Sequence, residues 1–259
     1  MKLRVKKRKN LISPLKRSSG RSNQGKITVR HKGGGVKRLY RVVNFGQDPM
    51  NVKGVVKGVE YDPNRTADIA LIEYENGEFK YIIAPQELKV GDEIITAEKA
   101  EVKPGNRMRI KNIPVGARVY NVTIYPEGKA KLARSAGTGV FILAHDDNMT
   151  QLRMPSREVR KVFSECFATV GEVSRPEHRY RVIGKAGTAR KMNRRPVVRG
   201  SAMSPYAHPH GGGEGRAPIG MPGPKTPWGK PARGVRTRKR KHTDRYIVKR
   251  AEKKRRGKK

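Results

Sequence analysis

Two histidines spaced two residues apart, His208 and His210, open the stretch HPHGGGEGR and could bind a metal ion or act as general bases. A zinc site needs four ligands, and the single cysteine, Cys166, lies more than 40 residues away. A general base needs an organised nucleophile, and nothing in the sequence organises Ser201 or Ser204. We therefore expect no catalytic residue, no metal site and no cofactor. Both imidazoles are expected to hydrogen-bond or stack against nucleic acid.

Two glycine triplets lie in basic surroundings, Gly33–Gly35 and Gly211–Gly213. The second is not a P-loop, because no Gly-Lys-Ser/Thr follows it, and it is not a dinucleotide fingerprint, because no strand precedes it. Glycine lets the backbone approach a phosphate or base closely and permits positive φ. A flexible linker is the alternative for either triplet. The basic residues of RHKGGGVKR (30–38) favour a turn that contacts RNA.

The stretches 184–191 and 193–200 mix Lys and Arg with small residues, which is typical of an arm lying in an RNA groove. A solvated tail is the alternative, and it fits less well because Val197 and Val198 resemble anchoring points. Tyr206 could stack on a base. Trp228 could do the same, or it could pack on a folded domain.

The excess positive charge lies at the two ends of the chain. The 259 residues include 60 Lys or Arg and 22 Asp or Glu, which gives a net charge of +38. Residues 1–47 hold fifteen basic residues and no acid, whereas residues 48–104 hold seven basic and twelve acidic residues. Residues 229–259 hold sixteen basic and two acidic residues. This pattern indicates a globular body with basic arms that become ordered against phosphates.

Other features narrow the class of protein. No apolar run approaches the roughly 20 residues that span a bilayer, so we expect no membrane partner. The start, MKLRVKKRKN, lacks the apolar region of a signal peptide, although its basic, acid-free composition leaves an organellar presequence open. A single cysteine excludes an intramolecular disulfide and suggests a reducing compartment.

The body of the chain reads as short strands separated by turn signals. Asn76-Gly77 between alternating segments is a strong hairpin signal. Helical turns are plausible at 85–88 and near 176–184, and the periodicity stops after about residue 180. The strands are predicted over 26–31, 36–45, 51–63, 67–85 and 92–97, and then over 117–126, 139–155, 158–164 and 168–174. Each group is typical of a small β-barrel.

Eight motifs, in this order along nearly the whole chain, resemble the bacterial form of one family, that of the universal second protein of the large ribosomal subunit. They are RHKGGG (30–35), EYDPNRTADIAL (60–71), KPGN (103–106), NIPVGARVYNV (112–122), LARSAGTGV (132–140), CFATVGEVS (166–174), RVIGKAGTARK (181–191) and HPHGGGEGR (208–216).

The resemblance implies a mainly β fold. It consists of a basic N-terminal arm (1–25), an OB-like β-barrel (26–103), an SH3-like β-barrel (104–180) and an irregular basic C-terminal extension (181–259). It also implies a structural protein that binds large-subunit rRNA near the peptidyl transferase centre and supports subunit association, tRNA binding and peptide-bond formation by the rRNA. The residues expected to bind rRNA are Arg30, His31, Lys32, Gly33, Gly34, Gly35, Lys37, Arg38, Arg65, Arg134, Lys185, Arg190, Arg194, Arg195, Arg199, His208, His210, Gly211, Gly212, Gly213, Arg216, Trp228, Lys230, Arg238, Lys239 and Arg240.

The implied partners are large-subunit rRNA, other large-subunit proteins and small-subunit rRNA at an intersubunit bridge, without homo-oligomers. The implied location is the cytoplasmic ribosome of a bacterium, with an organellar ribosome as the alternative. Two rival functions remain open. A chromatin-type DNA-compacting protein would share the basic tails, and an RNA-modifying enzyme could use barrel domains, although no carboxylate–histidine or cofactor motif supports it.

Overall fold

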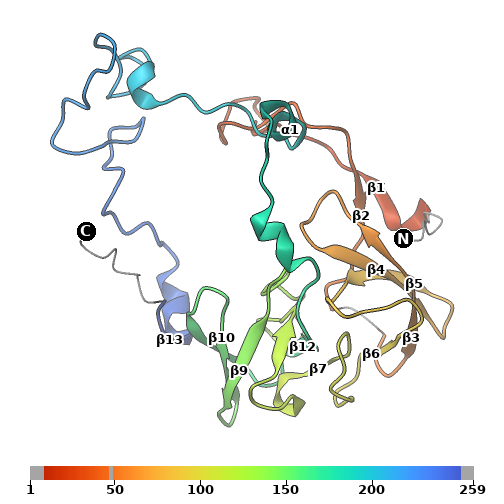
Figure 1. Cartoon of the computed structure of the whole chain (residues 1–259). Coiled ribbons are helices and arrows are strands. Elements are labelled where there is room, and N and C mark those ends of the chain that lie inside the picture. The colour runs from red at the N-terminus through yellow and green to blue at the C-terminus, as the bar shows by residue number, and fades with distance from the viewer. Residues whose placement is uncertain (1–8, 47–48, 252–259) are drawn as a thin grey trace. The chain divides into compact units, whose positions relative to one another are not determined.

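The structure is a computed structural model that describes residues 9–46 and 49–251 (Figure 1). The chain divides into two compact units that do not follow chain order. The β unit contains residues 38–182 together with both ends of the described chain, 9–15 and 243–251. The basic unit contains residues 16–37 and 183–242, all of them described. Residues 1–8 of the predicted N-terminal arm lie outside the described part.

The first sheet of the β unit is antiparallel with the order β5-β4-β3-β6. Its predicted hairpin is confirmed: Gly77 turns with a φ of +76°, and the Tyr74 N–H donates to the Glu78 carbonyl at 2.9 Å. A separate two-stranded ladder pairs β1 with β2. The strands are β1 Ile12–Pro14, β2 Leu39–Arg41, β3 Lys53–Tyr61, β4 Asp68–Tyr74, β5 Phe79–Ile83 and β6 Glu93–Ile95.

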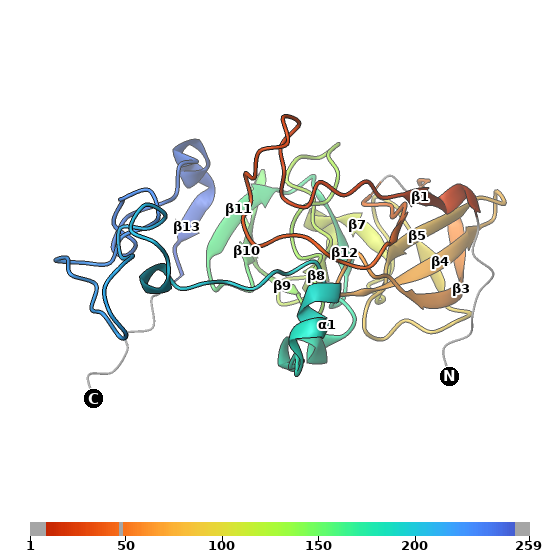
Figure 2. The same ribbon diagram turned by 90° about the horizontal axis from the view of Figure 1, so that it is seen from above.

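The second sheet has the order β13-β11-β10-β9-β8-β12-β7, and Figures 1 and 2 show β13 beside the β9–β11 group. Its strands are β7 Arg107–Arg109, β8 Arg118–Tyr120, β9 Val140–His145, β10 Met149–Arg153, β11 Val159–Phe163, β12 Phe167–Val170 and β13 Ile247–Lys249. The helical elements of the chain are short: η1 Lys9–Leu11, η2 Ile110–Asn112, η3 Pro176–Tyr180, α1 Ala186–Lys191, η4 Gly200–Ala202 and η5 Lys241–Tyr246. The mainly β class predicted from the sequence is confirmed.

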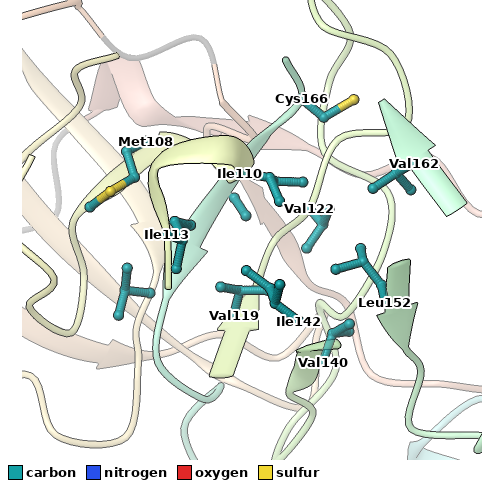
Figure 3. Close-up of a cluster of buried hydrophobic side chains, with 12 residues drawn as sticks. Met108, Ile110, Ile113, Val119, Val122, Val140, Ile142, Leu152, Val162 and Cys166 are labelled. Atoms are coloured by element: carbon teal, nitrogen blue, oxygen red, sulfur yellow. The ribbon is translucent and has the colours of Figure 1, made fainter. Parts of the chain in front are cut away.

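The second sheet encloses an apolar core (Figure 3). Val119, Ile142 and Leu152 come from three different strands and are at most 1% exposed. Cys166 lies in the same cluster, and burial raises the pKa of its thiol. This core uses the alternate residues of the predicted strands, as expected for a small β domain.

The first sheet buries apolar side chains on both faces. Tyr81 is 1% exposed, and its hydroxyl donates to the Glu60 carboxylate at 3.3 Å. Burial, reinforced by the negative charge of Glu60, raises the pKa of Tyr81 to about 12. The core clusters of the β unit contain only residues of that unit.

Three predicted strands are wrong in whole or in part. Over 26–31 only Ile27 forms an isolated bridge, to Arg21, because this segment has no neighbouring strand to pair with. The strand predicted over 36–45 shrinks to β2, and the one over 117–126 shrinks to β8. The remaining predicted strands appear with boundaries shifted by a few residues.

Three strands and one α-helix were not predicted: β1, β7, β13 and α1. The strands span three residues each and α1 spans six, too few for a periodic pattern to be detected. Two of these elements, β13 and α1, lie in the segment expected to be irregular. The helical turn near 176–184 is confirmed as η3, whereas 85–88 forms a non-helical turn. Among the residues described, no helix is long and apolar enough to cross a membrane.

Candidate nucleic-acid interface

The basic unit has the charge of a polyanion-binding surface and no apolar core. Its 82 residues include 22 Lys or Arg and a single acid, Glu214. Only Gly33 and His208 are buried within it. With so little apolar burial, the conformation of this unit depends on backbone hydrogen bonds and on whatever it binds.

Within this unit, two predicted RNA-binding motifs that lie about 160 residues apart in the sequence are joined (Figure 1). Lys32 and Arg194 form an antiparallel bridge. The Arg195 N–H donates to the His31 carbonyl at 3.1 Å, and the Val36 N–H donates to the Lys191 carbonyl at 3.1 Å. The motif RHKGGG and the residues that follow α1 are therefore one structural feature.

The first glycine triplet is shaped by contacts inside the chain. Gly33 and Gly34 have φ values of +139° and +71°, in the range that favours glycine. A Cβ on Gly35 would lie 2.9 Å from the Cβ of Asn193. The sequence suggested that glycine is needed here for close approach to RNA, but the structure adds an intramolecular reason, since a side chain at Gly35 would push the two segments apart.

The two histidines of HPHGGGEGR form hydrogen bonds within their own loop. The His210 N–H donates to Nδ1 of His208 at 3.0 Å, and the Lys225 N–H donates to Nε2 of His210 at 2.9 Å. The two ring centroids are 4.8 Å apart. His208 is 8% exposed and lies against Gly200, where a Cβ would approach the imidazole to 2.6 Å. Both imidazoles are thus acceptors that hold the loop.

The second glycine triplet is equally constrained. A Cβ on Gly211 would lie 2.3 Å from the Ser204 carbonyl oxygen, a distance that real side chains do not reach. Gly212 and Gly213 both have a φ of +81°. Close packing and positive φ together explain the run of glycines without reference to a catalytic role.

The hydroxyls of the serines near the two loop histidines are not paired with the imidazoles among the described residues. Within the described residues, no hydrogen bond joins the hydroxyl of Ser201 or Ser204 to an imidazole, and Ser204 contributes its backbone carbonyl instead. The described residues also contain no group of three His, Cys, Asp or Glu side chains able to hold a metal ion.

Three of the predicted rRNA-binding arginines lie in the β unit. Arg38 donates to the Pro63 carbonyl at 2.6 Å, and Arg65 donates to the buried carboxylate of Asp62 at 2.6 Å. The guanidinium groups of Arg65 and Arg134 lie 5.5 and 4.6 Å from the centre of the Phe45 ring. These contacts give the three arginines structural roles, and their RNA contacts remain predictions.

The other predicted residues are distributed along the basic unit, and most of them are exposed. Tyr206 is fully exposed and Trp228 is 75% exposed, so neither ring packs in a protein core. Arg30, Lys32 and Arg195 line one groove. The exposed or half-buried remainder is Lys37, Lys185, Arg190, Arg199, His210, Arg216, Lys230, Arg238, Lys239 and Arg240.

Sequence reasoning missed three residues that shape this unit. Arg17 donates to the Gly35 carbonyl at 2.5 Å, Asn193 packs on Gly35, and Pro196 accepts a hydrogen bond from His31. Basic composition could have marked Arg17. No local signal marks Asn193 or Pro196, because their partners are distant in the sequence.

The fold and the charged unit define a ribonucleoprotein component, in which a β body carries a basic, core-free unit for RNA. Two family descriptions match the chain: "Ribosomal Proteins L2, RNA binding N-terminal domain" over residues 8–96, and "Ribosomal Proteins L2, C-terminal domain" over residues 103–229. The chain belongs to the ribosomal protein L2 family. It is therefore a structural constituent of the large ribosomal subunit that binds rRNA and acts in translation beside other large-subunit proteins. The predicted OB-like and SH3-like barrels fit these two domains.

Proposed function

We propose that the chain is a primary binder of large-subunit rRNA whose basic unit lies near the peptidyl transferase centre. The observation that carries this proposal is the unit itself, with 22 basic residues, one acid and no apolar core. A segment of this composition is stabilised when phosphates neutralise its charges and RNA supplies the missing contacts. In this position the chain supports subunit association and tRNA binding.

The rRNA, and not this chain, carries out peptide-bond formation in this proposal. The supporting geometry is that His208 and His210 accept hydrogen bonds from the loop's own backbone. A ring nitrogen occupied in this way is not available to remove a proton from a substrate amine. The loop acts by presenting a fixed surface to RNA, and the chain is not an enzyme.

The partners in this proposal are large-subunit rRNA, neighbouring large-subunit proteins and small-subunit rRNA at an intersubunit bridge. The location is the ribosome of the bacterial cytoplasm or of an organelle.

Reconstitution of large subunits that lack this protein tests the proposal. Full-length chain added back should co-sediment with the particle after a high-salt wash and restore subunit joining and single-turnover peptide-bond formation. Particles carrying His210→Ala should retain most of their rate across pH, because no proton transfer depends on that ring. Fully assembled His210→Ala particles with a rate about a hundredfold lower, as expected for loss of a general base, would contradict the proposal.

A further inference from the structure

A groove of about 770 Å³ lies between the N-terminal segment of the basic unit and the residues that follow α1. Its volume is within the roughly 300–1,000 Å³ typical of pockets that hold small ligands. It is lined from two segments joined by the Lys32–Arg194 bridge and by the bond from the Arg195 N–H to the His31 carbonyl. The groove is therefore formed by the fold of one compact unit.

One wall of the groove is aliphatic. It contains Ile27, Val29 and Pro196. Ile27 and Val29 are 60% and 53% exposed, and they belong to the segment predicted as a strand with both residues on one face. The N–H groups of Thr28 and Val29 both donate to the Gly20 carbonyl, which keeps this backbone in place. The apolar pair thus lines the groove and packs in no core.

The remaining wall is cationic. Arg21, Arg30, Lys32 and Arg195 line it, and the only acid of the unit, Glu214, does not. Four positive charges beside an aliphatic surface match a ligand that combines an anion with a flat, weakly polar ring. A nucleotide has both parts.

His31 stands at the junction of the two segments. Its Nδ1 lies 3.1 Å from the Pro196 carbonyl oxygen, so this nitrogen carries the proton and donates. In the neutral ring Nε2 is then an acceptor, and His31 is one of the residues that line the groove. Its backbone has a φ of +60°, which is uncommon for a non-glycine residue and fixes where the ring projects.

We propose that this groove binds an unpaired nucleotide of RNA. The base lies against Ile27, Val29 and Pro196, and the flanking phosphates pair with Arg30, Lys32 and Arg195. A base-paired helix presents its phosphates, its 2′-hydroxyls and the base edges of its shallow minor groove, and none of these places a base face against the aliphatic wall. The inference rests on the proposed rRNA-binding function and names the kind of RNA element that this site takes.

Directed cross-linking of the full-length chain to large-subunit rRNA tests the inference. Ser19 lines the groove, and Cys166 is buried, so Ser19→Cys introduces the one accessible thiol among the described residues. A photoreactive azidophenacyl group on this thiol should cross-link to a nucleotide that reacts with 2′-hydroxyl acylating reagents in naked rRNA and becomes protected in the complex. Cross-links confined to base-paired nucleotides would overturn the inference.

A double variant separates the groove from the rest of the RNA contact. Ile27→Ser with Val29→Ser should abolish protection at the cross-linked nucleotide and lower rRNA affinity about tenfold, the effect expected for one lost base contact. The matched control is Ile219→Ser with Val235→Ser. Both of these residues are exposed aliphatic residues of the same unit outside the groove, and this pair should leave protection and affinity unchanged.

Protection that persists in the Ile27→Ser, Val29→Ser variant would overturn the unpaired-nucleotide site. Wild-type chain that fails to bind large-subunit rRNA at all would instead contradict the proposed function, so the two failures are distinguishable.

Discussion

Nδ1 of His208 lies 3.0 Å from the backbone nitrogen of His210, and the imidazole is therefore the acceptor of that N–H. Nε2 of His210 accepts from Lys225 in the same way at 2.9 Å. The two histidines, which from the sequence were expected neither to bind a metal nor to catalyse a reaction, close the loop of which they are part.

This relationship predicts the tautomer of each ring. Because Nδ1 of His208 accepts, its proton is on Nε2, and because Nε2 of His210 accepts, its proton is on Nδ1. Nitrogen-15 NMR of histidine-labelled chain distinguishes the two neutral tautomers by their chemical shifts. Opposite tautomers on the two rings are expected, and the same tautomer on both would contradict the hydrogen bonds described.

Gly211→Ala is expected to impair assembly of the large subunit more than His208→Ala or His210→Ala. The new Cβ would meet the Ser204 carbonyl oxygen at 2.3 Å, whereas loss of an imidazole removes one hydrogen bond, about 1–3 kcal/mol if its partner stays buried. Gly223→Ala is the matched control, since a Cβ on Gly223 would have no neighbouring atom within 4 Å. Sucrose-gradient profiles of reconstituted particles measure the difference. Equal assembly of the Gly211→Ala and Gly223→Ala particles would show that the packing described is unimportant.

Charges of the basic unit should determine the salt dependence of rRNA binding. Replacing Lys230, Arg233 and Arg236 by Gln should reduce the slope of log affinity against log salt by up to about 0.9 for each lost phosphate contact. The matched control replaces Lys53, Lys57 and Lys103, which form ion pairs with acids of the β unit. That control removes the same charge and should change the slope little, as measured by filter binding between low and moderate salt. A larger slope change in the control would place the phosphate contacts on the β unit.

The raised pKa of the buried Tyr81 hydroxyl predicts that the β unit loses stability at high pH. Its folded-state pKa of about 12 is above the unfolded value near 10, so its stabilising contribution is complete below pH 10 and declines as the pH rises toward 12. Denaturant unfolding between pH 9 and 12 should show this decline in the wild type and a smaller one in Tyr81→Phe. The same decline in both proteins would assign the effect to another group.

Local signals in the sequence were sufficient where one segment determines its own structure. Asn76-Gly77 fixed the β4–β5 hairpin, and alternating apolar residues marked most strands of both sheets. The strand expected over 26–31 failed because alternation of Ile27 with Val29 says only that the two share a face, and that face lines a groove. β7 could not be predicted, since its three residues, Arg107–Arg109, are too few for a periodic pattern to be detected.

The candidate interface was predictable in composition and not in geometry. Basic and glycine-rich composition marked RHKGGG and HPHGGGEGR, and both motifs lie in the basic unit, while their contacts with RNA remain predictions. The contact between His31 and Pro196 joins residues 165 positions apart, and no local pattern encodes it. The acceptor roles of the two loop histidines depend on backbone N–H positions, which sequence spacing does not specify.

Hydrogen exchange of the full chain, free and bound to large-subunit rRNA, tests the central claim most directly. Amides of the β unit, such as those of Val119 and Ile142, should exchange slowly in both states because their core is complete without RNA. Amides of the basic unit, such as those of Val36 and Arg195, should exchange rapidly in the free chain and become protected when rRNA binds. Equal protection of the basic unit in the free and bound chain would contradict the claim that RNA stabilises this unit.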